Sequence, residues 1–110
     1  MSSCIDSQPN VDVAHYVIVR ADLPHGSQVA QTIHAAGEST PRRLLPGTIA
    51  VALHARDRDH LACIGDDLDR AGLANHRVVE SDGELMAIGL EPTTDRNAVR
   101  KVLSKLPLVR

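Results

Sequence analysis

Aromatic residues are almost absent from this 110-residue chain, which contains no Phe, no Trp and only Tyr16. A hydrophobic core must therefore be built from Val, Ile, Leu and Ala, and the 43% hydrophobic content supplies them. The same absence disfavours domains that bind single-stranded RNA by stacking its bases on aromatic rings. A length of 110 residues predicts one domain with a core of modest size.

Cysteines and long apolar runs are scarce as well. Cys4 and Cys63 lie far apart, and no CxxC, HExxH or other metal-ligand spacing accompanies them or the six His. No apolar run approaches the roughly 18 residues of a membrane-spanning helix, and no signal peptide is recognisable. We therefore expect a cytoplasmic protein with free thiols, no metal and no cofactor. Cys63 is expected at an inward position of a helix.

Strong charge of one sign is lacking overall, since the formal net charge is −2. Every charge from Arg96 to Arg110 is nevertheless positive, including Arg100 and Lys101, and Arg42 and Arg43 form a second basic pair. These residues either contact nucleic-acid phosphates or form solvated surface.

Hydrophobic periodicity predicts alternating strands and helices after a polar tail at residues 1–13. The predicted strands are 15–20, 48–53, 76–80 and 85–90, and the predicted helices are 28–37, one beginning at Asp57 or Asp59 and ending at Gly72, and one after residue 92 capped by Thr93 or Thr94. The order β-α-β-α-β-β-α predicts an α/β fold in which residues 14–110 form a single domain. Its expected architecture is three-layered, α-β-α, with a four-stranded mixed sheet.

The first predicted helix has two contrasting sides. Val29, Ile33 and Ala36 recur at helical spacing and are expected to pack on the sheet, while Ser27 is expected to cap the helix. The opposite side carries Gln31, His34 and Glu38, together with Ser27.

Short motifs in a defined order resemble the type-2 peptidyl-tRNA hydrolase family. They are Val-Ile-Val-Arg at 17–20, Asp22-Leu23, Gly26, Ala-Gln-Thr-Ile-His-Ala at 30–35, and Ile-Gly-Leu-Glu-Pro at 88–92. The resemblance covers about residues 15–107. It implies that the chain hydrolyses the ester between a peptide and the 3′ end of tRNA, binds peptidyl-tRNA as its partner, and forms a homodimer.

Two departures from the family pattern affect the site. The family places a Lys before the first helix, where this chain has Pro-His-Gly-Ser-Gln at 24–28, and a family segment rich in threonine is reduced to residues 80–84. Catalysis is therefore assigned to His25 in place of the Lys, to Asp82 in place of a downstream Asp, and to His34. The expected substrate-binding residues are Asp22, Gln31, Glu38, Arg42, Arg43, Arg100 and Lys101.

Each assignment has a structural alternative. Asp82 precedes Gly83 and fits a type I′ turn, His25 fits a polar loop, and His34 fits a helix residue bonded to a neighbouring strand. The missing Lys favours a non-catalytic relative that binds tRNA, RNA or a protein. A hydrolase of another small ester or amide is the third interpretation.

Overall fold

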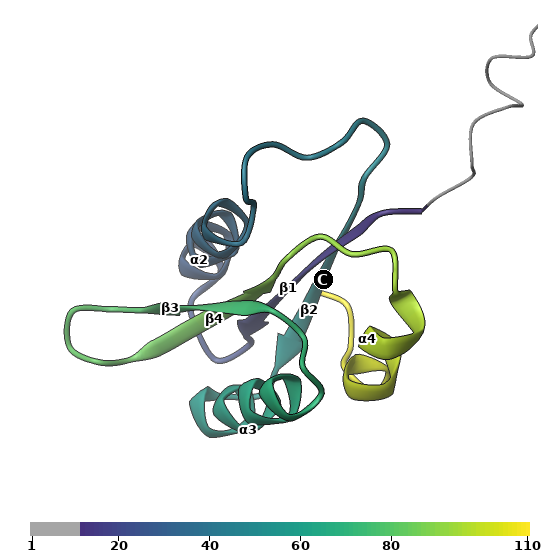
Figure 1. The fold of residues 1–110 in the computed structure, drawn as a ribbon. Helices are drawn as coiled ribbons and strands as arrows, with labels where there is room; N and C mark the ends of the chain where they lie inside the picture. Colours follow the sequence, from purple (N-terminus) through teal and green to yellow (C-terminus); the bar gives the residue numbers. More distant parts are fainter. Residues whose placement is uncertain (1–11) are drawn as a thin grey trace, which may run out of the picture.

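Strands and helices alternate in the predicted order in the computed structural model, which describes residues 12–110. The fold is α/β, with a four-stranded mixed sheet and three helices (Figure 1). The elements are β1 Ala14–Arg20, α2 His25–Glu38, β2 Ile49–Ala55, α3 Arg58–Arg70, β3 Asn75–Val79, β4 Leu85–Leu90 and α4 Arg96–Leu103.

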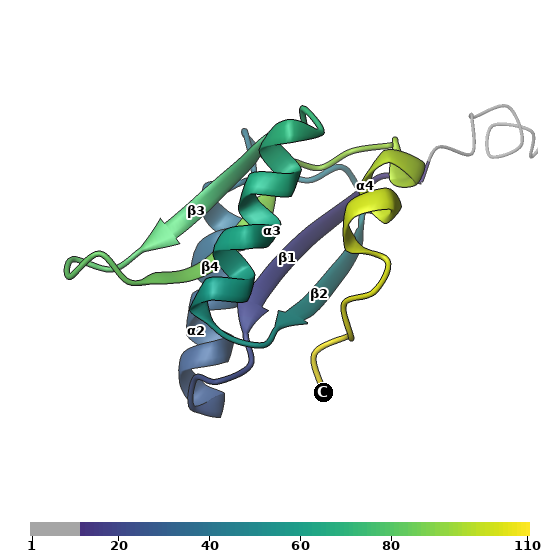
Figure 2. The ribbon, with the colours of Figure 1, turned by 90° about the horizontal axis from the view of Figure 1, so that it is seen from below.

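The sheet has the order β2-β1-β4-β3, so β1 lies inside it. β1 pairs with β2 in parallel along its whole length and with β4 antiparallel, and β3 completes the hairpin with β4. Helix α2 covers one face, and α3 and α4 lie on the other (Figures 1 and 2). Six of the seven β1 residues are buried, which explains why this strand is apolar without alternation.

The two faces carry two separate hydrophobic clusters. The α3 and α4 face contains the larger one, in which Ile18 and Ile88 of the sheet meet Leu61 and Leu68 of α3. The α2 face contains a smaller one built mainly from Val17, Val19, Ala35, Val78 and Ala87. Small side chains dominate under α2, so this helix lies close to the sheet.

The side of α2 that meets the sheet is not the one predicted. Val29 is 50% exposed and Ile33 67% exposed, whereas Ala35 is fully buried. Gly89 in β4 provides the reason, because a Cβ atom built on it would lie 2.5 Å from Ser39 Oγ and closer still to the Ala35 carbonyl oxygen. The helix therefore packs along its small residues, and its apolar side turns toward the edge of the sheet.

A buried hydrogen bond fastens the carboxyl end of α2. Ser39 Oγ donates to the Ala35 carbonyl oxygen at 2.7 Å and lies 2.7 Å from Nε2 of His15 in β1. Because the serine proton is used by the carbonyl, we assign the bridging proton to His15. Burial lowers the His15 pKa, so the neutral imidazole is favoured.

Helix starts were predicted less well than helix cores. α2 begins at His25 after Pro24, and no side chain caps it, so the predicted Ser27 cap is wrong and Ser27 lies inside the first turn. Asp95, rather than Thr93 or Thr94, caps α4 by accepting from the Ala98 N–H. Pro24 before α2 and Asp95 before α4 favour a helix start more strongly than the predicted caps do.

The hairpin between β3 and β4 was predicted correctly, but its turn type was not. Gly83 has a positive φ of 88°, and no residue other than glycine has one among the described residues, so Asp82 does not adopt the type I′ geometry. Asp82 Oδ1 instead accepts the Glu84 N–H at 3.0 Å. The turn is a local Asx arrangement closed by glycine.

Three other expectations concern the rest of the chain. Cys63 is exposed, so the prediction of a core position is wrong; Leu61, Ile64 and Leu68 provide the buried stripe of α3. No helix within residues 12–110 is long and apolar enough to cross a membrane. The predicted tail lies outside the described residues apart from 12 and 13, and the Val13 carbonyl accepts the Ile49 N–H.

Candidate functional site

Polar side chains gather at the carboxyl edge of β1 and β2, the usual position of sites in parallel sheets. Asp22 lies two residues after the end of β1, and α2 begins three residues later. His54 lies near the end of β2, and Asp57 follows that strand. The edge therefore has two sides, one facing α3 and the other facing α2.

A closed ion-pair network occupies the α3 side. Arg20 Nε and Nη2 donate to the two oxygens of Asp22 at 2.9 and 2.8 Å, and Nη1 donates to Glu84 at 2.7 Å. Arg58 adds a second bond to Glu84 at 2.9 Å. Hydrogen bonding to Arg20 lowers the pKa of both carboxyls, and the Asp22 bond raises that of the guanidinium. All these groups are charged at neutral pH, and Arg20 has its strong donors engaged.

This network does not suit a phosphate. The polar hollow around it, of about 280 Å³, is lined by two cations and four carboxylates: Arg20, Arg58, Asp22, Asp57, Asp59 and Glu84. The excess of carboxylates repels anions. Within residues 12–110 no group of three or more His, Cys, Asp or Glu side chains is placed to hold a metal ion.

The α2 side of the same edge presents the open amino end of a helix. The first N–H groups of a helix have no partner within it, and no side chain caps those of α2. His25 and Gly26 are exposed there, and nothing lies within 4 Å of the position of a Gly26 Cβ. Anions and developing negative charge are stabilised at such an end.

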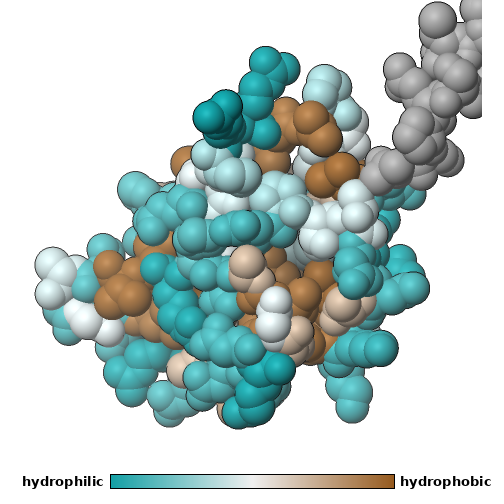
Figure 3. Space-filling view, in the orientation of Figure 1, coloured by the Kyte–Doolittle hydropathy of each residue, from teal (hydrophilic) through white to brown (hydrophobic). Residues whose placement is uncertain are grey.

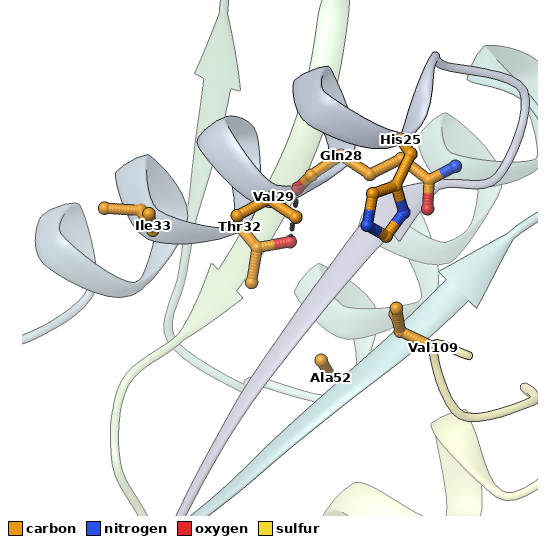
Figure 4. Close-up of a pocket in the computed structure, with 7 residues that line it drawn as sticks. All are labelled: His25, Gln28, Val29, Thr32, Ile33, Ala52 and Val109. Carbon is orange, nitrogen blue, oxygen red and sulfur yellow. Dashed lines mark hydrogen bonds between the residues drawn. The ribbon is translucent and has the colours of Figure 1, made fainter.

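Next to this helix end lies an apolar cleft of about 180 Å³, which we name the α2–β2 cleft (Figure 4). One wall is α2, the floor is Ala52 of β2, and the C-terminal segment contributes Val109. Its lining residues are His25, Gln28, Val29, Thr32, Ile33, Ala52 and Val109. The Val109 N–H donates to the Ala52 carbonyl oxygen at 2.9 Å, which holds the C-terminal segment against the outer edge of β2.

Gln28 is the fixed element of this side. Its Nε2 donates to the carbonyl oxygens of Ala21 and Leu23 at 3.2 and 2.8 Å, and its Oε1 lies 2.6 Å from His54 Nε2. These contacts join the loop after β1, the helix and β2. Gln28 thus holds the start of α2, and with it His25, at the carboxyl edge.

The structure divides the predicted site residues of α2, two catalytic and two substrate-binding, between two flanks of the helix. His25 lies on the flank facing β2, whereas Gln31, His34 and Glu38 share the flank nearer the hairpin. Gln31 Nε2 contacts Glu80 Oε1 at 3.3 Å, while His34 and Glu38 are exposed. Asp82 lies on the hairpin turn, where one carboxylate oxygen serves the turn itself. No hydrogen bond in the described part of the chain joins His25 to Asp82 or His34, so these three do not form one constellation.

The predicted basic residues also lie apart. Arg42 and Arg43 are exposed in the loop before β2, at the amino end of the parallel strands. The same loop exposes the apolar side chains of Leu44 and Leu45, and hydrophobic surface is visible in this part of the molecule (Figure 3). Seven strand residues separate that end from Asp22, about 20 Å. Arg100 and Lys101 lie in the last turn of α4 on the other face of the sheet, where they complement the helix dipole.

Sequence reasoning missed Arg20, Glu84, Gln28 and His54 as parts of the edge. A signal existed for His54, a polar residue interrupting an apolar strand. The Arg20–Glu84 contact joins residues 64 apart in the chain and left no local signal. Compared with models of known protein families and with curated proteins, the chain matches none.

Proposed function

We propose that this protein is a peptidyl-tRNA hydrolase with the fold of the type-2 family, acting on the ester that joins a peptide to the 3′ oxygen of tRNA. The observation that carries the proposal is the convergence of three parts at one edge. His25, the open amino end of α2 and the α2–β2 cleft lie together, because His25 is the first residue of α2 and lines the cleft. The motif order at residues 17–35, through which the chain resembles that family, leads directly to this edge.

In the proposed reaction His25 acts as the general base. Its imidazole accepts a proton from a water molecule, and the oxygen of that water attacks the ester carbonyl carbon. The free N–H groups of the first α2 turn stabilise the resulting oxyanion. The bond to the 3′ oxygen then breaks, and His25 returns the proton to that oxygen, which leaves an intact tRNA 3′ hydroxyl and a peptide carboxylic acid that releases its proton to solvent.

Asp22 contributes position rather than proton transfer in this proposal. Its carboxylate is held by two bonds from Arg20, which keep the loop between β1 and α2 in place. Gln31 and Glu38 keep their predicted role in substrate binding. Asp82 and His34 were predicted to be catalytic, and because no hydrogen bond joins either to His25, this proposal gives them contacts to the tRNA instead.

The test is release of labelled peptide from an N-acetyl-aminoacyl-tRNA. We expect cleavage well above the rate in water, and a loss of about 100-fold or more in His25→Ala, the usual contribution of a general base. His76→Ala is the matched control, because His76 pairs with Glu91 at the other end of the hairpin. Asp82→Asn and His34→Ala test the other two assignments. Cleavage at the wild-type rate in His25→Ala would exclude the proposed mechanism.

A non-catalytic binding protein is the second candidate, and two observations favour it. The guanidinium of Arg20 is saturated by carboxylates, and Val29 and Ile33 expose an apolar helix side suited to a protein partner. Measurable tRNA binding without ester cleavage would support this candidate against the hydrolase.

A cytoplasmic location and a homodimer belong to the same proposal. The substrate occurs where translation takes place, and sedimentation equilibrium of the purified protein measures the oligomeric state.

A further inference from the structure

The α2–β2 cleft has polar atoms at its walls that are already satisfied by the protein. Thr32 Oγ1 donates to the Gln28 carbonyl oxygen at 2.7 Å, and both ends of the Gln28 amide are bonded to the loop and to His54. What these residues present to the cleft is therefore mainly hydrocarbon. Val29, Ile33, Ala52 and Val109 complete an apolar lining.

Formal charge is missing from this region. No Lys, Arg, Asp or Glu occurs from residue 23 to residue 37, and none lines the cleft. The polar exception is His25, whose ring lies over the cleft at the amino end of α2; no interaction joins it to the other lining residues (Figure 4). An occupant must accordingly be uncharged and apolar at one end and polar at the other, where it meets His25 and the helix N–H groups.

Size narrows the class of occupant. The cleft measures about 180 Å³. This is below the roughly 300 Å³ at which sites for drug-sized ligands begin, and an aliphatic cavity of roughly 150 Å³ accepts a benzene ring. One branched aliphatic side chain fits these limits, whereas a folded peptide or a nucleoside does not.

We propose that the α2–β2 cleft binds the aliphatic side chain of the amino acid that is esterified to tRNA. This proposal rests on the proposed hydrolase function and adds a substrate preference to it. With the side chain in the cleft, the ester carbonyl lies at the polar end, beside His25 and the first N–H groups of α2. Substrates ending in Leu, Ile or Val are then preferred over those ending in Gly or Asp.

Two measurements test the preference. The first compares kcat/KM for N-acetyl-leucyl-, N-acetyl-glycyl- and N-acetyl-aspartyl-tRNA. The second measures the Kd of N-acetyl-leucyl and N-acetyl-glycyl adenosines whose 3′ ester is replaced by a non-hydrolysable amide. We expect the leucyl compound to be preferred about tenfold or more in both, the usual discrimination of a small apolar pocket. The amide resonances of Ala52 and Val109 should shift when it binds.

Three variants test whether the preference for the leucyl compound arises in the α2–β2 cleft. Ala52→Ile fills the floor of the cleft and should reduce kcat/KM and affinity for the leucyl compound to those for the glycyl compound. Ala50→Ile is the matched control, since Ala50 is exposed on the same side of the same strand and outside the cleft. Ile33→Ala removes an exposed wall residue with little risk to folding, and should lower the leucyl preference about threefold to tenfold.

The outcomes separate this proposal from the proposed function. If all three tRNAs are cleaved at equal rates and Ala52→Ile behaves like Ala50→Ile, the proposed hydrolase function stands and the proposed binding of the side chain in the cleft is wrong. Preferential binding of the leucyl amide without cleavage supports the cleft and overturns the hydrolase. If both isoleucine variants dissociate a dimer and neither changes ligand binding, a second copy covers this surface and the cleft proposal is wrong.

Discussion

Gly89→Ala tests how α2 is seated on the sheet. Gly89 lies in β4 under the carboxyl end of α2, and its new Cβ would meet Ser39 Oγ at 2.5 Å, Ser39 Cβ at 2.9 Å and the Ala35 carbonyl oxygen closer still. Ordinary van der Waals contact begins at 3.4 Å. The helix must move away by about 1 Å, because the oxygen of a helix backbone cannot rotate aside.

The expected cost is about 1–3 kcal/mol of unfolding free energy, the usual range for an overpacked core, and the upper end applies because backbone is involved. Gly37→Ala is a control of opposite sign. Gly37 lies near the end of α2 with nothing within 4 Å of its Cβ position, so alanine should stabilise the helix by about 0.5–1 kcal/mol.

Urea denaturation followed by circular dichroism measures both changes. With a slope of about 1–1.5 kcal/mol per molar urea, Gly89→Ala should lower the midpoint by about 1–3 M and Gly37→Ala should raise it by about 0.3–1 M. A Gly89→Ala midpoint equal to or above that of the wild type would refute the close seating of α2 and, with it, the exposure of Val29 and Ile33.

Three further predictions concern charge. Burial lowers the His15 pKa from 6.5, so at low pH the unfolded chain binds a proton that the folded chain does not, and stability should fall as pH drops below about 6.5, by at most about 1.4 kcal/mol per pH unit. The urea midpoint should therefore fall more between pH 7.5 and pH 5.5 in the wild type than in His15→Gln, and an equal fall in both would contradict the prediction. Arg20→Lys should cost about 1–2 kcal/mol of unfolding free energy, because lysine cannot replace the bidentate contact with Asp22. Arg58→Lys should cost under about 0.5 kcal/mol, because the Arg58 side chain is 53% exposed. Equal losses in the two variants would contradict the central place of Arg20 in the ion-pair network. Arg100→Glu with Lys101→Glu should weaken tRNA binding and flatten its salt dependence, and an unchanged slope would assign both residues to the helix dipole alone.

Local patterns were sufficient for the order and type of the elements. The stripe Leu61, Ile64 and Leu68 repeats at helical spacing and is buried in α3, and the apolar run at 85–90 forms β4 with the predicted bounds. Gly72 and Gly83 mark chain reversals and have positive φ angles. Such signals are read within one turn or one strand, so the α/β class and the mixed sheet follow from the sequence.

Only the tertiary structure decided how α2 is rotated on the sheet. Periodicity separated its apolar side from its polar side correctly, but a missing side chain at Gly89 and the His15–Ser39 contact determined that neither side faces fully inward. Because α2 starts at His25, the spacing of the helix puts His25 and Gln31 on different flanks, and the rotation turns the His25 flank toward the α2–β2 cleft. Contacts between distant segments have no local periodicity, and for that reason the sequence by itself identified candidate site residues without showing which of them meet.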